Sequence, residues 1–176
     1  MTAPMDSQET QAILQFFQQG GALRMLLGKD VGPELDVLFR YAKQLSSVGE
    51  YGAAARLFKV LTIYDEWSFE YWFELGVCCQ ADKAWVDAIY AYGRSAQIRV
   101  SAAIAPCAAG ECYLACGNRP LAAKAFRAAL LVCGTERDGE EHEGEEYGGM
   151  GQAEIRQRAR AGLVKAEGEH EKFNTD

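Results

Sequence analysis

The stretch FEYWFELGVCCQADKAWVDAIYAYGRSAQIRVSA, residues 69–102, decides how this chain folds. Its first half carries an apolar stripe from Trp72 to Cys79 at i, i+3, i+4 and i+7, the spacing of one face of a helix. Its second half carries a similar stripe at helical spacing, formed by Ala88, Tyr92 and Ser95. The short polar segment 80–83 lies between the halves, so the two helices are predicted to double back on each other as a hairpin.

The same pattern occurs once on each side of this stretch, at a spacing of 34 residues. Seven positions keep their character in all three copies, and only Pro106 departs from type. They are Leu38, Tyr41, Ala42, Leu45, Ala54, Phe58 and Leu61 in the first copy, Trp72, Leu75, Gly76, Cys79, Ala88, Tyr92 and Ser95 in the second, and Pro106, Ala109, Gly110, Tyr113, Ala122, Phe126 and Ala129 in the third. The pattern resembles the tetratricopeptide repeat, whose hairpins bury their apolar sides by stacking. An unrelated helical bundle with chance periodicity is the alternative.

We therefore predict an all-α protein with three tandem tetratricopeptide-type hairpins in a right-handed superhelix, with an N-terminal helix and a C-terminal capping helix. Pro106 fits this scheme only if its helix begins near Ile104, because proline lacks the N–H that a helix interior uses. The predicted parts are an N-terminal helical segment at 1–34, repeats at 35–68, 69–102 and 103–136, an acidic flexible linker at 137–150, a capping helix at 151–168 and a disordered tail at 169–176.

The acidic segment 136–146 holds seven acids against one Arg. Such a composition cannot bury enough apolar surface to order itself, which favours a solvated linker. A metal-binding acidic loop is the alternative, although no calcium-loop spacing is present. Helical spacing returns after Gly151, where the predicted capping helix would cover the exposed side of the last hairpin.

Composition narrows the classes of function. The 176 residues are 49% hydrophobic, enough for one core, and the net charge of −7 argues against nucleic acid as a partner. No apolar run reaches the roughly 18 residues of a membrane-spanning helix, so stable membrane insertion is not expected. The N-terminus shows no secretory signal pattern, which favours a cytoplasmic protein.

Catalysis and metal binding find no support in the sequence. The six cysteines all fall in predicted helices without a C-x-x-C motif, which favours reduced core thiols over a metal site. Both histidines, His142 and His170, lie in the charged C-terminal part. With no nucleophile–base pair and no phosphate-binding glycine loop, we expect a non-enzymatic protein without metal or cofactor.

A partner site is predicted on the inner face of the repeats. Helical rotation places the second, fifth, ninth and twelfth positions of each repeat opposite the packing side. The predicted client-binding residues are Phe39, Arg40, Lys43, Ser46, Glu70, Phe73, Val77, Gln80, Ile104, Cys107, Glu111 and Leu114. The apolar members form a track that suits an extended peptide, whose backbone groups would meet Lys43, Gln80 and Glu111. The alternative is that the terminal helices cover this track.

Several motifs resemble the type III secretion class II chaperones, three-repeat proteins that hold pore-forming translocators before export. These motifs are LTIYD at 61–65 followed by Trp67, YWFELG at 71–76 and GECYL at 110–114. Within that family, GGALRMLL at 20–27 and IYAYGR at 89–94 are most similar to the chaperone of the larger translocator in intracellular enteric bacteria. The resemblance covers roughly residues 11–134.

This resemblance implies a cytoplasmic chaperone without enzymatic activity. It also implies that an extended segment near the N-terminus of the client, of the Pro-x-Leu-x-x-Pro kind, lies in the groove. Carried over by position, Phe39, Phe73, Val77 and Cys107 match groove-lining places. Family members often have aromatic residues where this chain has Lys43 and Ser46, so its first pocket is expected to be shallower or differently selective.

The N-terminal segment carries its own apolar stripe, for which two interpretations stand side by side. It could fold back on the repeats as a cap, or it could serve self-association, and the family resemblance favours a homodimer because its members commonly dimerise through this region. The candidate dimerisation residues are Ile13, Phe16, Phe17, Leu23 and Leu26.

A generic repeat adaptor that binds C-terminal tails is the competing function. Such a carboxylate clamp needs Lys, Asn and Arg at inner positions, where this chain has residues such as Phe39, Glu74 and Ile104. A terminal carboxylate would therefore meet apolar or acidic surface, which disfavours the adaptor.

Overall fold

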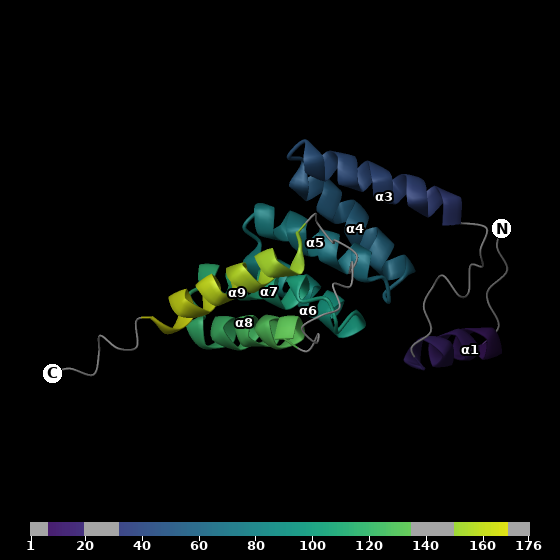
Figure 1. Ribbon diagram of the computed structural model, residues 1–176. Coiled ribbons are helices and arrows are strands. Elements are labelled where there is room, and N and C mark those ends of the chain that lie inside the picture. Colours follow the sequence, from purple (N-terminus) through teal and green to yellow (C-terminus); the bar gives the residue numbers. More distant parts are fainter. Residues whose placement is uncertain (1–6, 20–31, 135–149, 169–176) are drawn as a thin grey trace.

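The computed structural model describes residues 7–19, 32–134 and 150–168, and all regular structure in these ranges is helical (Figure 1). The helices are α1 (Ser7–Gln18), α3 (Gly32–Ser47), α4 (Tyr51–Tyr64), α5 (Phe69–Ala81), α6 (Trp85–Ile98), α7 (Ile104–Ala115), α8 (Arg119–Gly134) and α9 (Gln152–Glu167). The predicted linker and tail lie largely outside the described residues, as do Leu23 and Leu26.

The seven helices from α3 to α9 form one continuous array of sequential pairs. The hairpins α3–α4, α5–α6 and α7–α8 stack on one another, and α9 packs on α8 and α7. Figure 1 shows α1 apart from this array. The predicted all-α, tetratricopeptide-like fold is confirmed, with one hairpin for each copy of the sequence pattern.

A small residue facing an aromatic ring recurs inside the hairpins. A Cβ atom on Gly76 would lie 2.6 Å from the ring of Tyr92, and one on Gly110 would lie 2.8 Å from the ring of Phe126. Both rings are buried, and both pairs sit at the same two repeat positions. The absence of a side chain on these glycines is what lets the two helices of each hairpin approach closely.

The hairpin turns also repeat with the 34-residue period. Gly49 and Gly117 have φ angles of 87° and 73°, in the left-handed region that favours glycine. Lys83 occupies the equivalent position of the second turn with φ of 60°. The backbone geometry is therefore conserved between the repeats even where the residue is not glycine.

Replacing Lys83 with glycine is expected to stabilise the protein by up to about 1 kcal/mol. The left-handed region costs a residue with a Cβ atom roughly 1–2 kcal/mol, and glycine removes this cost. The greater conformational entropy of glycine in the unfolded chain offsets part of the stabilisation. Urea unfolding followed by circular dichroism measures the change. Lys124→Gly, within helix α8, is the control and should destabilise by about 1 kcal/mol; a destabilised Lys83→Gly variant would contradict the strain argument.

The helix ends follow from local sequence. The Ser68 hydroxyl accepts a hydrogen bond from the Tyr71 amide at 3.3 Å, and the side-chain oxygen Oδ1 of Asn118 accepts one from the Leu121 amide at 3.2 Å. Helix α7 begins at Ile104, as Pro106 requires, so the missing proline N–H falls in the first turn where it has no helical partner to lose.

The C-terminal helix α9 completes the core. Ile155 and Ala159 are buried, and Arg156 Nη2 donates a hydrogen bond to the carbonyl oxygen of Cys133 at 2.5 Å. An ion pair joins Arg127 of α8 to Glu167 of α9. Helix α9 therefore covers the last hairpin, as the capping-helix prediction expects.

Five of the six cysteines are buried and free, as expected of core thiols. The sixth, Cys116, is exposed at the end of α7, so its prediction as a core residue is wrong. Burial raises the pKa of Cys78 to about 11 and that of Cys107 to about 12, which keeps both thiols protonated and unreactive near neutral pH.

Candidate functional site

A cavity of 540 Å³ opens on the side of the array to which the first helix of each hairpin contributes. We call it the groove cavity. Its lining comes from α3, α5, α6, α7 and α9, and from Met150 just before α9. The lining residues are Lys43, Ser46, Ser47, Phe73, Glu74, Val77, Gln80, Ala81, Tyr92, Ile104, Ala108, Met150 and Arg158.

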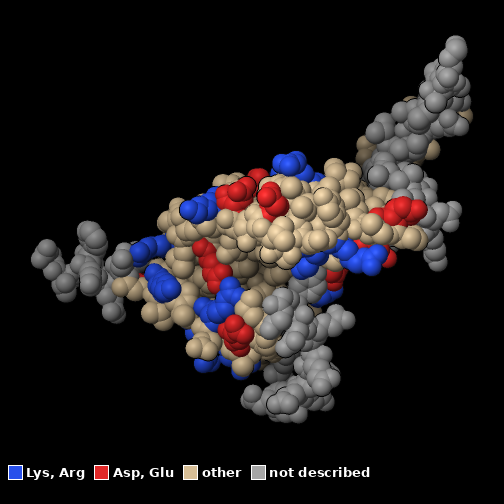
Figure 2. Space-filling view, turned by 90° about the horizontal axis from the view of Figure 1, so that it is seen from above, with Lys and Arg blue, Asp and Glu red and all other residues tan. Residues whose placement is uncertain are grey.

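The cavity wall is apolar in its middle and charged at its two ends. Phe73, Val77 and Ile104 supply apolar surface, whereas Lys43 and Arg158 bring one cation each from opposite ends of the array. Figure 2 shows acidic and basic side chains side by side on the face seen from above, among large uncharged areas. This mixture suits a ligand with apolar side chains and a polar backbone.

At the first hairpin, Lys43 is held by a buried acid. Lys43 Nζ donates to Glu74 Oε1 at 2.5 Å, and the Glu74 side chain is only 7% exposed against 48% for Lys43. Nearby, the Cys78 thiol contacts the Ser46 hydroxyl at 3.6 Å. The buried Glu74 carboxylate thus neutralises the Lys43 ammonium group, while the exposed part of Lys43 stays accessible to a ligand.

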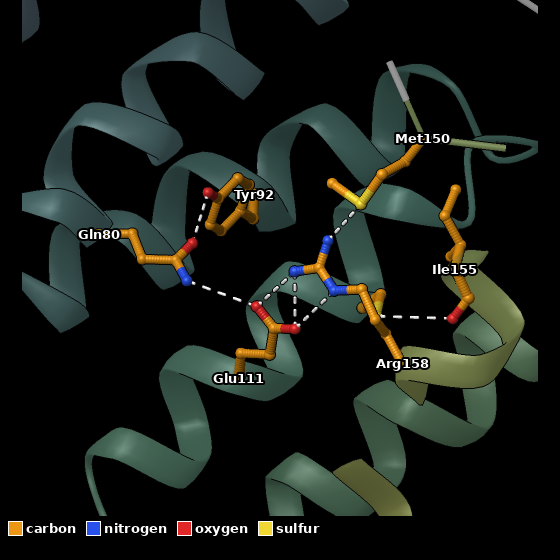
Figure 3. A network of polar contacts seen from close by, with 7 residues as sticks. Gln80, Tyr92, Glu111, Met150, Ile155 and Arg158 are labelled. Carbon is orange, nitrogen blue, oxygen red and sulfur yellow. Dashed lines mark hydrogen bonds and ion pairs between the residues drawn. The ribbon is translucent and has the colours of Figure 1, made fainter. Parts of the chain in front are cut away.

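Between the second and third hairpins, a polar network joins helices α5, α6, α7 and α9 (Figure 3). The Tyr92 hydroxyl donates to Gln80 Oε1 at 2.7 Å, and Gln80 Nε2 lies 3.5 Å from Glu111 Oε2. Arg158 grips the same carboxylate through Nη2, at 2.7 Å and 2.8 Å from its two oxygens, and through Nε at 3.1 Å. Its remaining terminal nitrogen, Nη1, points at the Met150 sulfur at 2.6 Å.

Burial and charge act in opposite directions on Arg158. Burial alone lowers its pKa, but the hydrogen bonds and charge of Glu111 outweigh this, so the pKa of Arg158 is raised above its ordinary value. Burial likewise raises the pKa of the Tyr92 phenol. Arg158 is therefore charged and Tyr92 protonated near neutral pH.

The structure brings six of the twelve predicted client-binding residues together around the groove cavity. The six are Lys43, Ser46, Phe73, Val77, Gln80 and Ile104. A seventh, Glu111, lies next to the cavity through its bonds to Gln80 and Arg158. The inner-face reasoning thus identifies a real hollow, although client binding by these residues stays a prediction.

The open apolar track expected from the sequence is largely covered, and that expectation is wrong. Phe73 is 5% exposed and stacks on Phe69, with ring centroids 5.5 Å apart. Ile104 and Cys107 are buried, and the Cys107 thiol lies 4.0 Å from the backbone oxygen of Ile155. Helix α9 lies over this end of the track, as the alternative of a covering terminal helix anticipated.

Phe39 also turns into the packing between helices. Its ring lies 5.9 Å from that of Phe58 on α4 and 5.5 Å from that of Tyr71 on α5, measured between centroids. It remains half-buried but does not line the groove cavity. Phe39 was predicted to be exposed, but it packs between the first two hairpins. Burial of an aromatic ring between helices is more favourable than its exposure to water.

The remaining predicted residues lie elsewhere. Arg40 is exposed and its Nε lies 3.4 Å from the backbone oxygen of Asp36, one turn earlier. Glu70 pairs with Arg99 at 2.6 Å. Leu114 lines a separate small hollow beside α9.

The sequence-based prediction missed seven of the thirteen residues that line the groove cavity: Ser47, Glu74, Ala81, Tyr92, Ala108, Met150 and Arg158. Tyr92 is one of the repeat positions assigned to packing, so its hydroxyl was not expected here. Glu74 was placed on the inner side only as a residue unsuited to a carboxylate clamp. Met150 and Arg158 follow the acidic segment, outside the 34-residue register. The position of Arg158 directly before the buried Ala159 in the capping helix is the one signal that could have pointed to it.

Within the part of the chain that the structure describes, no helix is long and apolar enough to cross a membrane. Among the same residues, no group of three or more His, Cys, Asp or Glu side chains could hold a metal ion.

No family model matches the chain. The chain is 29% identical over 113 residues to the low calcium response locus protein H of Yersinia pestis, covering 64% of this chain and 67% of that protein.

Two solved structures extend the similarity to three dimensions. A type III secretion complex from Aeromonas hydrophila matches with a TM-score of 0.75 and 25% identity, over 91% of this chain and 97% of that one. The Yersinia enterocolitica type III secretion chaperone SycD, bound to a peptide of the translocator YopD, matches with a TM-score of 0.66 and 21% identity, over 80% and 95%. In fold and at moderate sequence identity, this chain is similar to the type III secretion translocator chaperones.

Proposed function

We propose that this protein is a non-enzymatic, cytoplasmic chaperone that binds an extended segment of a type III secretion translocator and keeps that translocator soluble and competent for secretion. The groove cavity carries the proposal, because it joins all three hairpins and combines apolar walls with polar groups able to meet a peptide backbone. A translocator carries membrane-seeking stretches, and occupying part of its apolar surface before export would prevent premature aggregation.

The comparisons support this proposal. SycD, which shares the fold, is a secretion chaperone crystallised with a translocator peptide. The competing adaptor function is disfavoured because Lys43, a cation that a carboxylate clamp would use, already pairs with Glu74. A segment with apolar side chains fits the groove cavity better than a free carboxylate does.

The finer parts of the proposal rest on the sequence motifs. The segments 20–27 and 89–94 favour the larger of the two translocators as the client, bound through a segment near its N-terminus. Self-association through the N-terminal region also stays a proposal: α1 is apart from the array, and neither the side chains of Ile13 and Phe17 nor residues Leu23 and Leu26 are among those described.

Val77→Asp is expected to weaken client binding by about tenfold or more. Val77 lines the groove cavity and is half-buried, so a carboxylate there would face the bound segment and lose its hydration on binding. Titration of the purified variant with the YopD peptide of the SycD complex, followed by isothermal calorimetry, measures the loss.

Val86→Asp is the matched control. Val86 is 76% exposed on α6 and does not line the groove cavity, so its substitution should leave the affinity unchanged. Equal affinities of the Val77→Asp and Val86→Asp variants would contradict the assignment of the site.

A further inference from the structure

We propose that Arg158 of the capping helix is a client-binding residue, and that its Nη1 donates a hydrogen bond to a main-chain carbonyl oxygen of the bound segment. This inference rests on the proposed function and deepens it. Helix α9 would then contact the client directly as well as covering the last hairpin.

The two sides of the Arg158 guanidinium group face different surroundings. Nε and Nη2 donate hydrogen bonds to the Glu111 carboxylate, and these bonds fix the plane and direction of the guanidinium group. Nη1 points at the sulfur of Met150, and Arg158 and Met150 both form part of the lining of the groove cavity. Glu111 thus leaves one charged donor directed at a residue of the cavity wall, where a client segment could replace the methionine sulfur.

The acceptor that Nη1 meets in the absence of a client is a poor one. It is the Met150 thioether sulfur, at 2.6 Å. Thioethers accept hydrogen bonds weakly, whereas a charged N–H forms strong bonds with carbonyl oxygen. Exchange of sulfur for a peptide carbonyl is therefore favourable, and the flexible methionine side chain can move aside to fill space against the ligand.

The chemistry of the occupant suits this exchange. An extended peptide presents one carbonyl oxygen per residue, and it loses water from these groups when it enters an apolar cavity. Phe73, Ile104 and Ala108 line the same cavity and offer no side-chain donor. Arg158 would thus satisfy a client carbonyl at the third hairpin that would otherwise be buried without a partner.

The test compares two arginines that both tie α9 to the array. Arg158→Met is expected to bind the YopD peptide about tenfold or more weakly than the wild-type chain, the scale of one hydrogen bond to a charged group. Arg127→Met removes the ion pair to Glu167 but does not touch the groove cavity, so it should bind as the wild type does. Urea unfolding of both variants measures how far each substitution loosens α9.

A second measurement identifies the bond itself. Replacing single backbone amides of the peptide by esters weakens one carbonyl acceptor at a time. In the wild-type chain one ester should reduce affinity more than it does in Arg158→Met, and this coupling should appear at one peptide position. If Arg158→Met does not fold, Arg158→Lys takes its place, because one ammonium group cannot serve Glu111 and the client together.

The outcomes separate the two proposals. A wild-type chain that does not bind the YopD peptide contradicts the proposed function itself. Wild-type binding that Arg158→Met retains in full contradicts the role of Arg158 alone. An equal loss in Arg158→Met and Arg127→Met, without coupling to any ester, would show that Arg158 only holds α9 in place, and would overturn the inference.

Discussion

Phe126→Ala is expected to lower the free energy of unfolding by about 3–5 kcal/mol. The ring is fully buried, and it packs between the backbone of α7 at Gly110 and the backbone of α9 at Gly162. Neither glycine has a side chain that could fill the space left behind, so the substitution adds a cavity to the loss of buried apolar surface. Three helices lose their common contact at once.

Urea unfolding and thermal melting, both followed by circular dichroism, measure this change. For a chain of this size the loss corresponds to a drop in melting temperature of roughly 6–20 °C. Leu131→Ala is the control, because Leu131 is 69% exposed on the same helix and its removal should matter by less than about 0.5 kcal/mol. Similar unfolding midpoints for the two variants would show that the Phe126 ring is not the contact between the hairpin and α9.

Phe126 also shows why the fold could be predicted from the sequence. The 34-residue period relates Phe126 to Tyr92 and Gly110 to Gly76. In the structure, the Tyr92 ring packs on Gly76 and the Phe126 ring packs on Gly110. Where small and large residues recur at the same repeat positions, the same helix–helix contacts recur in each hairpin. A regular pattern of side-chain size in the sequence therefore predicts a regular pattern of packing. The turn at 80–83 was also predicted, but the left-handed backbone of Lys83 was not, because residues other than glycine rarely adopt it.

The candidate site was harder to predict because part of its wall, Met150 and Arg158, comes from outside the repeats. Rotation along a helix gives the direction of a side chain, but it does not say what lies opposite. Ile104 and Cys107 point to the inner side and are buried there, since α9 lies over them. The position of α9 depends on contacts made after an acidic segment of no fixed period, and no spacing rule places Arg158 beside Glu111.

The Arg158–Glu111 pair couples the site to the core. Both side chains are about one third exposed, so the ion pair alone adds little stability. Its contribution lies in direction, because the bidentate contact orients α9 toward the groove cavity. Packing against Phe126 supplies the stability of α9, and the ion pair supplies its alignment.

Gly162→Ala tests this division of roles and is expected to cost about 3 kcal/mol of folding stability. A Cβ atom at this position would lie 2.3 Å from Phe126 Cζ, with two further ring atoms at 2.5 Å and 2.6 Å. The ring cannot move away freely, since Gly110 already borders it on α7. Helix α9 must therefore shift, and overpacking of this kind costs roughly 1–3 kcal/mol or more.

The shift should be visible in α9 itself. Hydrogen–deuterium exchange of its backbone amides is expected to become faster in Gly162→Ala than in the wild type, and YopD peptide binding should weaken because Arg158 moves with the helix. Gly93→Ala is the matched control: a Cβ atom at Gly93 meets nothing within 4 Å, so alanine in this helix should stabilise by about 0.5–1 kcal/mol. If both substitutions changed the unfolding free energy in the same direction, close packing of α9 on Phe126 would be wrong, and α9 could not hold Arg158 over the groove cavity.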